Sequence, residues 1–73
     1  METTVRQWFE ANGDHVFAED GDGRPALYVV ESDGVICLCD ANTSELFADD
    51  APASTLTGMA EELMAEWARE EAR

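Results

Sequence analysis

The sequence predicts an α+β fold with a short N-terminal helix, a three- or four-stranded antiparallel sheet and a longer C-terminal helix packed on the sheet. Apolar residues recur at helical spacing near both ends of the chain, and an Asp-Gly pair separates two β-rich runs in the middle. The chain has 73 residues, which suffice for one compact domain over residues 1–73 with a thin core.

The first helix is predicted over roughly residues 3–12. Thr4 and Gln7 have the spacing of a capping box, in which each side chain accepts a hydrogen bond from the other residue's backbone N–H. Asn12 and Gly13 form a C-terminal stop, because glycine readily adopts the positive φ that ends many helices.

The middle of the chain is predicted to form the sheet. A brief apolar cluster at 16–18 is followed by a loop rich in glycine and then by a strand over 26–32. Asp33 and Gly34 suit the positive φ angles of a type I′ turn, so this strand should continue into a tight hairpin. A further short strand is expected around 45–48.

The hairpin register puts apolar residues on both faces of the sheet. With a two-residue turn, Val30 faces Cys37 and Tyr28 faces Cys39 on one side. The other side carries Leu27, Val29, Ile36 and Leu38. Two helices cannot easily cover both faces in so small a chain. The face with Tyr28 is therefore left open to the shorter helix, a terminal segment, a second copy of the chain or another partner.

The C-terminal helix is predicted to be the longest element. Residues 49–52 break the preceding strand, and Ser54 is the expected N-cap. From Leu56 onward the apolar residues follow one helical stripe, namely Met59, Ala60, Leu63, Met64 and Trp67. The simplest packing places both helices on one face of the sheet, with Trp8 and Trp67 inserted into the core.

The chain is strongly acidic. It has 17 Asp and Glu residues against 4 basic residues, all of them Arg, and its net charge is −13. Such a charge repels itself in the compact state and disfavours nucleic acid and anionic membranes as direct partners. A basic protein surface is the natural counterpart, and the hydrophobic content of 45% indicates a folded chain rather than a disordered acidic tail.

The sequence offers no constellation for catalysis or metal binding. His15 is the only histidine, and Cys37 and Cys39 lack the spacing of a structural zinc site, so both thiols are interpreted as small buried apolar groups. We expect no enzymatic activity and no cofactor or metal. The N-terminal residues do not resemble a signal peptide, and we expect a cytoplasmic location.

The unbalanced acids concentrate in turns and at strand ends. Arg69 and Arg73 are expected to offset the end of the last helix through pairs with Glu66 and Glu70, which leaves Arg24 as the lone basic neighbour of the other acids. The predicted partner-binding residues are Glu19, Asp20, Asp22, Glu31, Asp33, Asp40, Glu45, Asp49, Asp50, Glu61 and Glu62, with Tyr28 as an apolar anchor. Phe47 is a second candidate anchor.

In length, acidity and expected fold the chain resembles the small inhibitors of the anti-CRISPR type that phages and mobile elements encode, among them DNA mimics. The resemblance covers the whole chain and rests on no family motif. It implies a CRISPR effector subunit or another nucleic-acid-binding protein as partner, with the acids occupying its basic groove.

Two other interpretations remain open. An excess of Asp and Glu without Lys is also typical of adaptation to molar salt, in which case the charge reflects a saline environment and not a partner. Alternatively, the chain is an accessory interaction module that pairs through the apolar sheet face. Salt dependence separates these hypotheses, because a mimic loses affinity steeply with salt and a halophilic protein unfolds without it.

Overall fold

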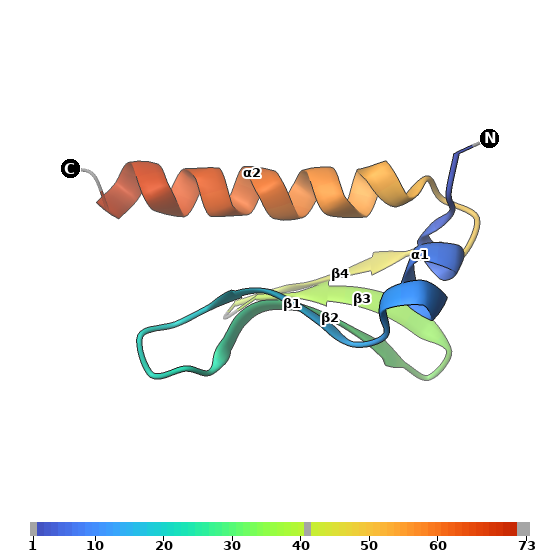
Figure 1. Cartoon of the computed structure of the whole chain (residues 1–73), viewed down its shortest axis with the longest axis horizontal. Coiled ribbons are helices and arrows are strands. Elements are labelled where there is room, and N and C mark those ends of the chain that lie inside the picture. Colours follow the sequence, from blue (N-terminus) through green and yellow to red (C-terminus); the bar gives the residue numbers. More distant parts are fainter. Residues whose placement is uncertain (1, 41, 72–73) are drawn as a thin grey trace.

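The computed structural model describes residues 2–40 and 42–71, and it has two layers (Figure 1). A four-stranded sheet forms one layer, and the long helix α2 (Ala53–Glu71) lies along one of its faces. The short helix α1 (Val5–Asn12) sits at one end of that same face. The predicted α+β class and the placement of both helices on one side of the sheet are confirmed.

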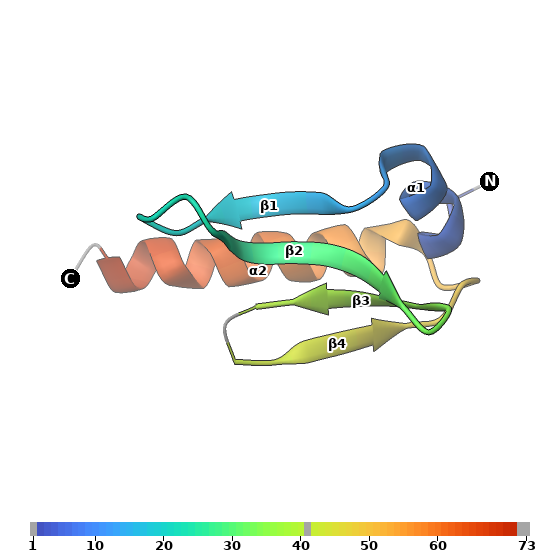
Figure 2. The ribbon, with the colours of Figure 1, turned by 90° about the horizontal axis from the view of Figure 1, so that it is seen from below.

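The sheet is an antiparallel meander. Its strands β1 (His15–Glu19), β2 (Pro25–Ser32), β3 (Val35–Cys39) and β4 (Ser44–Phe47) lie side by side in chain order. Figure 2 views the sheet from the side opposite α2, and no helix lies in front of the strands. The brief apolar cluster around Phe17 forms β1, a strand at one edge of the sheet. The sheet therefore has four strands, the larger of the two predicted numbers.

The capping box and the glycine stop predicted for the first helix are both present at α1. Gln7 N–H donates to the Thr4 hydroxyl at 3.2 Å, and Thr4 N–H donates to the Gln7 side-chain oxygen at 3.0 Å, which completes the capping box. Gly13 has a φ of 67° and its N–H donates to the carbonyl of Phe9. Because Thr4 is the cap, the helix proper begins at Val5 rather than at residue 3.

The β2–β3 hairpin has the predicted register. Tyr28 lies opposite Cys39 and Val30 lies opposite Cys37. Asp33 and Gly34 have φ angles of 54° and 79°, which are the positive values that a type I′ turn requires. The turn thus fixes which residues face α2.

The core lies between α2 and the facing side of the sheet. Strand residues Leu27, Val29 and Ile36 are fully buried, and Leu56 and Ala60 of α2 are buried against them. Trp8 and Trp67 pack against this core but are only partly buried, so their predicted insertion is confirmed in part. Trp8 stacks on Phe17 of β1 with ring centroids 5.9 Å apart.

The start of α2 differs from the prediction. The helix begins at Ala53, so Ser54 lies within its first turn, and its hydroxyl donates to Glu2 instead of capping the helix. The backbone fixes this start, because Ala53 N–H donates to the Thr3 carbonyl and Val5 N–H donates to the Ala51 carbonyl, both at 2.8 Å. The first turns of both helices are thereby tied together.

Replacement of Leu56 by alanine tests this core. Leu56→Ala removes a fully buried side chain and leaves a cavity, so we expect a loss of about 2–5 kcal/mol in the free energy of unfolding. Thr55→Ala changes an exposed side chain of the same helix and should stay within about 0.5 kcal/mol. Urea unfolding followed by tryptophan fluorescence measures both, and equal losses would contradict this account of the core.

Candidate partner-binding surfaces

The side of the sheet that faces away from α2 is apolar and uncovered. We call it the outer sheet face, and its outward-pointing residues are Val16, Tyr28, Val30, Ser32, Val35, Cys37, Cys39, Ser44 and Leu46. Val16, Val35 and Leu46 are 41%, 37% and 67% exposed. Tyr28 and Val30 are half-buried. None of these residues is charged, although the chain carries 17 acids.

Two shallow hollows lie on the outer sheet face. One of about 270 Å³ is bordered by Val16, Tyr28 and Val30. The other, of about 400 Å³, is bordered by Val35 and Leu46 at the opposite pair of strands. One carboxylate lies at the edge of each hollow, Asp14 for the first and Asp49 for the second. The outer sheet face is therefore uneven as well as apolar.

The two cysteines occupy the middle of this face. Both are free, and Cys37 and Cys39 are only 7% and 9% exposed, because larger side chains on the neighbouring strands flank them. Burial raises the pKa of the Cys37 thiol above its ordinary value, and the nearby Cys39 raises it further. The interpretation of both residues as small buried apolar groups agrees with the structure.

Arg6 corrects the charge distribution predicted from sequence. Its guanidinium donates to Glu31, to the carbonyl of Gly34 at 3.0 Å and to Asp49 at 3.0 Å. The pKa of Arg6 is raised by these hydrogen bonds, first by the one to Glu31 and then by the one to Asp49. The prediction that Arg24 is the lone basic neighbour was wrong, because α1 brings Arg6 over the end of the sheet.

Other predicted acids also have local partners. Arg24 pairs with Asp22 at 3.1 Å and approaches Asp20 at 3.9 Å, while Asp20 also accepts backbone N–H bonds within its own turn. Asp40 accepts from the backbone N–H groups of Asn42 at 2.8 Å and Thr43 at 2.7 Å. These bonds lower the pKa of Asp40 below its ordinary value. These acids build turns, which limits their availability to a partner.

The remaining predicted acids have exposed side chains that form no hydrogen bond or ion pair among residues 2–40 and 42–71. They are Glu19, Asp33, Glu45, Asp50, Glu61 and Glu62. They do not converge on one surface, since Glu19 ends β1, Asp33 and Asp50 lie in turns, Glu45 lies on β4, and Glu61 and Glu62 lie on α2. Within this described part Glu66 and Arg69 form no ion pair either, and Arg73 lies outside it.

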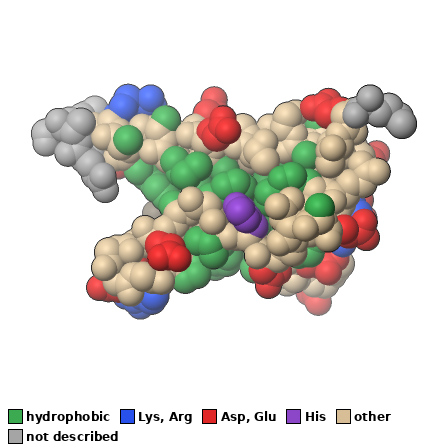
Figure 3. All heavy atoms as spheres, viewed as in Figure 1, with side chains coloured by type: hydrophobic (Ala, Val, Ile, Leu, Met, Phe, Trp, Pro, Cys, Tyr) green, Lys and Arg blue, Asp and Glu red, His purple; other side chains and the backbone are tan. Residues whose placement is uncertain are grey.

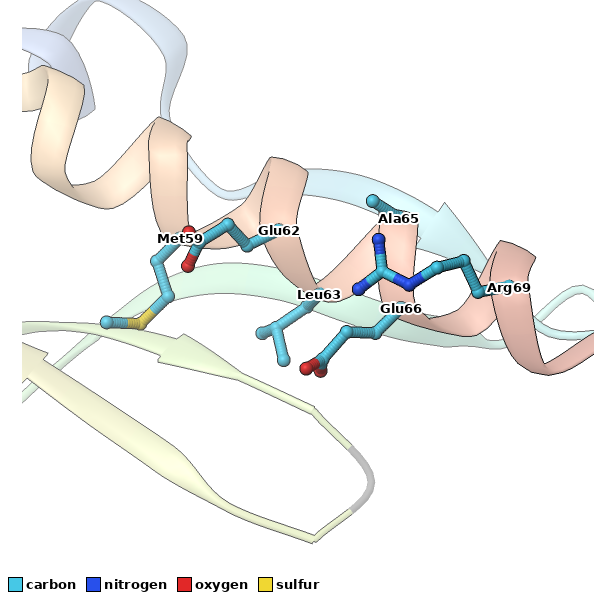
Figure 4. Close-up of a pocket in the computed structure, with 6 residues that line it drawn as sticks. All are labelled: Met59, Glu62, Leu63, Ala65, Glu66 and Arg69. Carbon is cyan, nitrogen blue, oxygen red and sulfur yellow. The ribbon is translucent and has the colours of Figure 1, made fainter.

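A third hollow, of about 320 Å³, combines acidic and apolar side chains (Figure 4). Met59 and Leu63 of α2 extend from the helix toward the β3–β4 hairpin, with Glu62 and Glu66 beside them. Arg69 lies at the end of the hollow. We call this site the α2 hollow. On the opposite side of α2, which faces the viewer in Figure 3, apolar side chains also fill a recess between the helix and the strands.

The α2 hollow separates two acids that sequence analysis treated alike. Glu62 borders it, whereas Glu61, one position earlier on the helix, does not. Glu66 also borders it, although the sequence prediction assigned Glu66 only to a pair with Arg69. The spacing carried the missing signal, because residues four apart share one side of a helix and Glu62 and Glu66 are so spaced.

The two predicted apolar anchors differ in access. Tyr28 is half-buried on the outer sheet face and borders one of its hollows. Phe47 is only 8% exposed and belongs to the core, because it lies opposite Ile36 on the side that faces α2. Phe47 was therefore the wrong candidate, and the reason is the alternation of side chains along β4.

Among the described residues no three His, Cys, Asp or Glu side chains are grouped so as to hold a metal ion. No helix in the described part of the chain is long and apolar enough to cross a membrane. Comparison of the chain with protein-family models, curated proteins and solved structures gave no match.

Replacement of Arg6 tests whether its pairs hold the fold together. Arg6→Gln removes contacts that join α1 to β2, to the β2–β3 turn and to the connection before α2, so we expect a lower urea midpoint. Arg24→Gln is the matched control, because the Arg24 pairs stay within one turn. A midpoint that falls equally or more in Arg24→Gln would contradict the role assigned to Arg6.

The Asp40 turn predicts a specific acid dependence. Because the folded-state pKa of Asp40 is lowered, its contribution to stability is present above the unfolded value and is lost as pH falls through the folded value. The side-chain carboxyl carbon of Asp40, followed by NMR, should titrate with a midpoint below 3.8. Asp40→Asn should remove this part of the acid dependence, and a midpoint at or above 3.8 would refute the assignment.

Proposed function

We propose that this protein is a non-enzymatic binding protein that presents carboxylates to a basic surface of a nucleic-acid-binding protein. In its narrower form the proposal takes that partner to be a CRISPR effector complex whose DNA-binding groove is blocked. The observation that supports it best is the α2 hollow, where Glu62 and Glu66 stand beside the apolar side chains of Met59 and Leu63.

The α2 hollow suits a long basic side chain. The aliphatic stem of a lysine or arginine can lie against Met59 and Leu63 while its charged head meets a carboxylate. Nucleic-acid-binding grooves are lined with such side chains, which normally meet phosphates. Other exposed acids, for example Glu45 on β4 and Asp50 in the turn before α2, add a longer-range attraction that accelerates encounter.

Displacement of DNA tests the proposal. A labelled DNA duplex is bound to purified CRISPR effector complexes, and its release on addition of this protein is measured at about 0.05 M and 0.3 M salt. We expect release from at least one complex, with a steep loss of affinity at the higher salt. Glu62→Gln with Glu66→Gln should weaken binding by about tenfold or more.

The matched control keeps the same change in net charge. Glu10→Gln with Glu70→Gln neutralises two exposed helical acids outside the α2 hollow and should leave most of the affinity intact. Equal losses in both double variants, or a flat salt dependence, would refute the α2 hollow as the site. Unfolding of the protein below about 1 M KCl would instead assign its charge to a saline environment and overturn the proposal.

A further inference from the structure

The end of α1 contains a chemically reactive pair of residues, Asn12 followed by Gly13. An asparagine that precedes glycine is prone to lose its side-chain amide, because glycine has no side chain to hinder attack by its own backbone nitrogen. Asn42, the only other asparagine in the chain, precedes Thr43, whose β-branched side chain hinders the same attack. Asn12 is therefore the asparagine at which this chemistry is favoured.

The reaction, deamidation, joins two atoms of this pair and needs only water as co-reactant. The backbone nitrogen of Gly13 gives up its proton and forms a bond to the side-chain carbonyl carbon (Cγ) of Asn12. The bond between Cγ and Nδ2 breaks, and Nδ2 takes up the proton and leaves as ammonia. Water then opens the resulting succinimide ring at one of its two carbonyls, which gives either aspartate or isoaspartate. Nothing is oxidised or reduced in these steps.

The fold holds both reacting groups in hydrogen bonds. Asn12 Nδ2 donates to the carbonyl of Trp8 at 2.7 Å, and Gly13 N–H donates to the carbonyl of Phe9 at 2.6 Å. Ring closure requires the Gly13 nitrogen to lose its proton and turn toward Cγ, so it breaks both bonds and the last turn of α1. This helix has only 8 residues, a length at which opening is easy. We propose that Asn12 is a deamidation site that reacts only when α1 opens.

The product weakens the helix that protects the site. Loss of the amide removes the donor to Trp8 and puts a carboxylate at the C-terminus of α1, where the helix dipole disfavours negative charge. An isoaspartate also lengthens the backbone between α1 and β1, which disturbs the stacking of Trp8 on Phe17. Because α1 carries Arg6, its contacts with the sheet are loosened as well. Deamidation is thus an irreversible step that releases α1.

Peptide mapping by mass spectrometry tests the proposal. The full chain is kept at mildly alkaline pH, in buffer and in urea, and the conversion of each asparagine to its acid is followed with time. We expect Asn12 to react at least about tenfold faster in urea than in buffer, because urea removes the helix. Asn42 should react more slowly than Asn12 in urea. Equal rates at Asn12 in the two conditions would overturn the proposal.

Two variants test whether α1 is the element that must open. Thr4→Ala removes the cap at the opposite end of α1 and leaves the reacting atoms unchanged. Loss of such a cap makes a helix about fivefold easier to open, so Asn12 should react about fivefold faster in buffer and at the wild-type rate in urea. Thr55→Ala changes an exposed side chain of α2 and should leave both rates unchanged. A Thr4→Ala chain that reacts at the wild-type rate in buffer would overturn the proposal.

Discussion

The structure depends on the packing of a single long helix against one face of the sheet. α2 has 19 residues and buries Leu56 and Ala60 against the strand residues that face it. No second element of comparable length is available among the described residues, since α1 has only 8. One face of the sheet therefore becomes the core, and the other remains at the surface whatever its composition. The apolar character of that second face is what requires a functional explanation.

Most of the fold follows from patterns that act over a few residues. The capping box of Thr4 and Gln7 and the turn at Asp33 and Gly34 are local, and the turn in turn fixes the register of the hairpin. The predictions that were wrong concern contacts between segments far apart in the sequence. Arg6 meets Glu31 and Asp49 only because the fold brings them together, and Ser54 loses its capping role because the backbone near residue 3 fixes the start of α2. Such contacts have no signature in a single sequence.

The acids of this chain divide into two groups with different roles. One group is structural, since Glu31, Asp49 and Asp40 hold α1 to the sheet or close a turn. The other group is exposed and carries the net repulsion of the molecule. The two groups look alike in the sequence, because what separates them is whether the fold brings a basic side chain or a backbone N–H group to each carboxylate. Only Glu62 among the predicted acids borders the α2 hollow, and Glu66, four positions later on the same side of the helix, was missed.

The irregular pairing of β1 protects one edge of the sheet. Its register against β2 shifts twice, between Val16 and Ala18 and again before Glu19, so the free edge of β1 does not present an even ladder of backbone groups. At the opposite edge β4 is only 4 residues long and carries Glu45. Both edges are thus poor templates for a further strand, a device that natural sheets use against open-ended aggregation. A sheet whose outer face is apolar is in this way kept from growing into fibres along its edges.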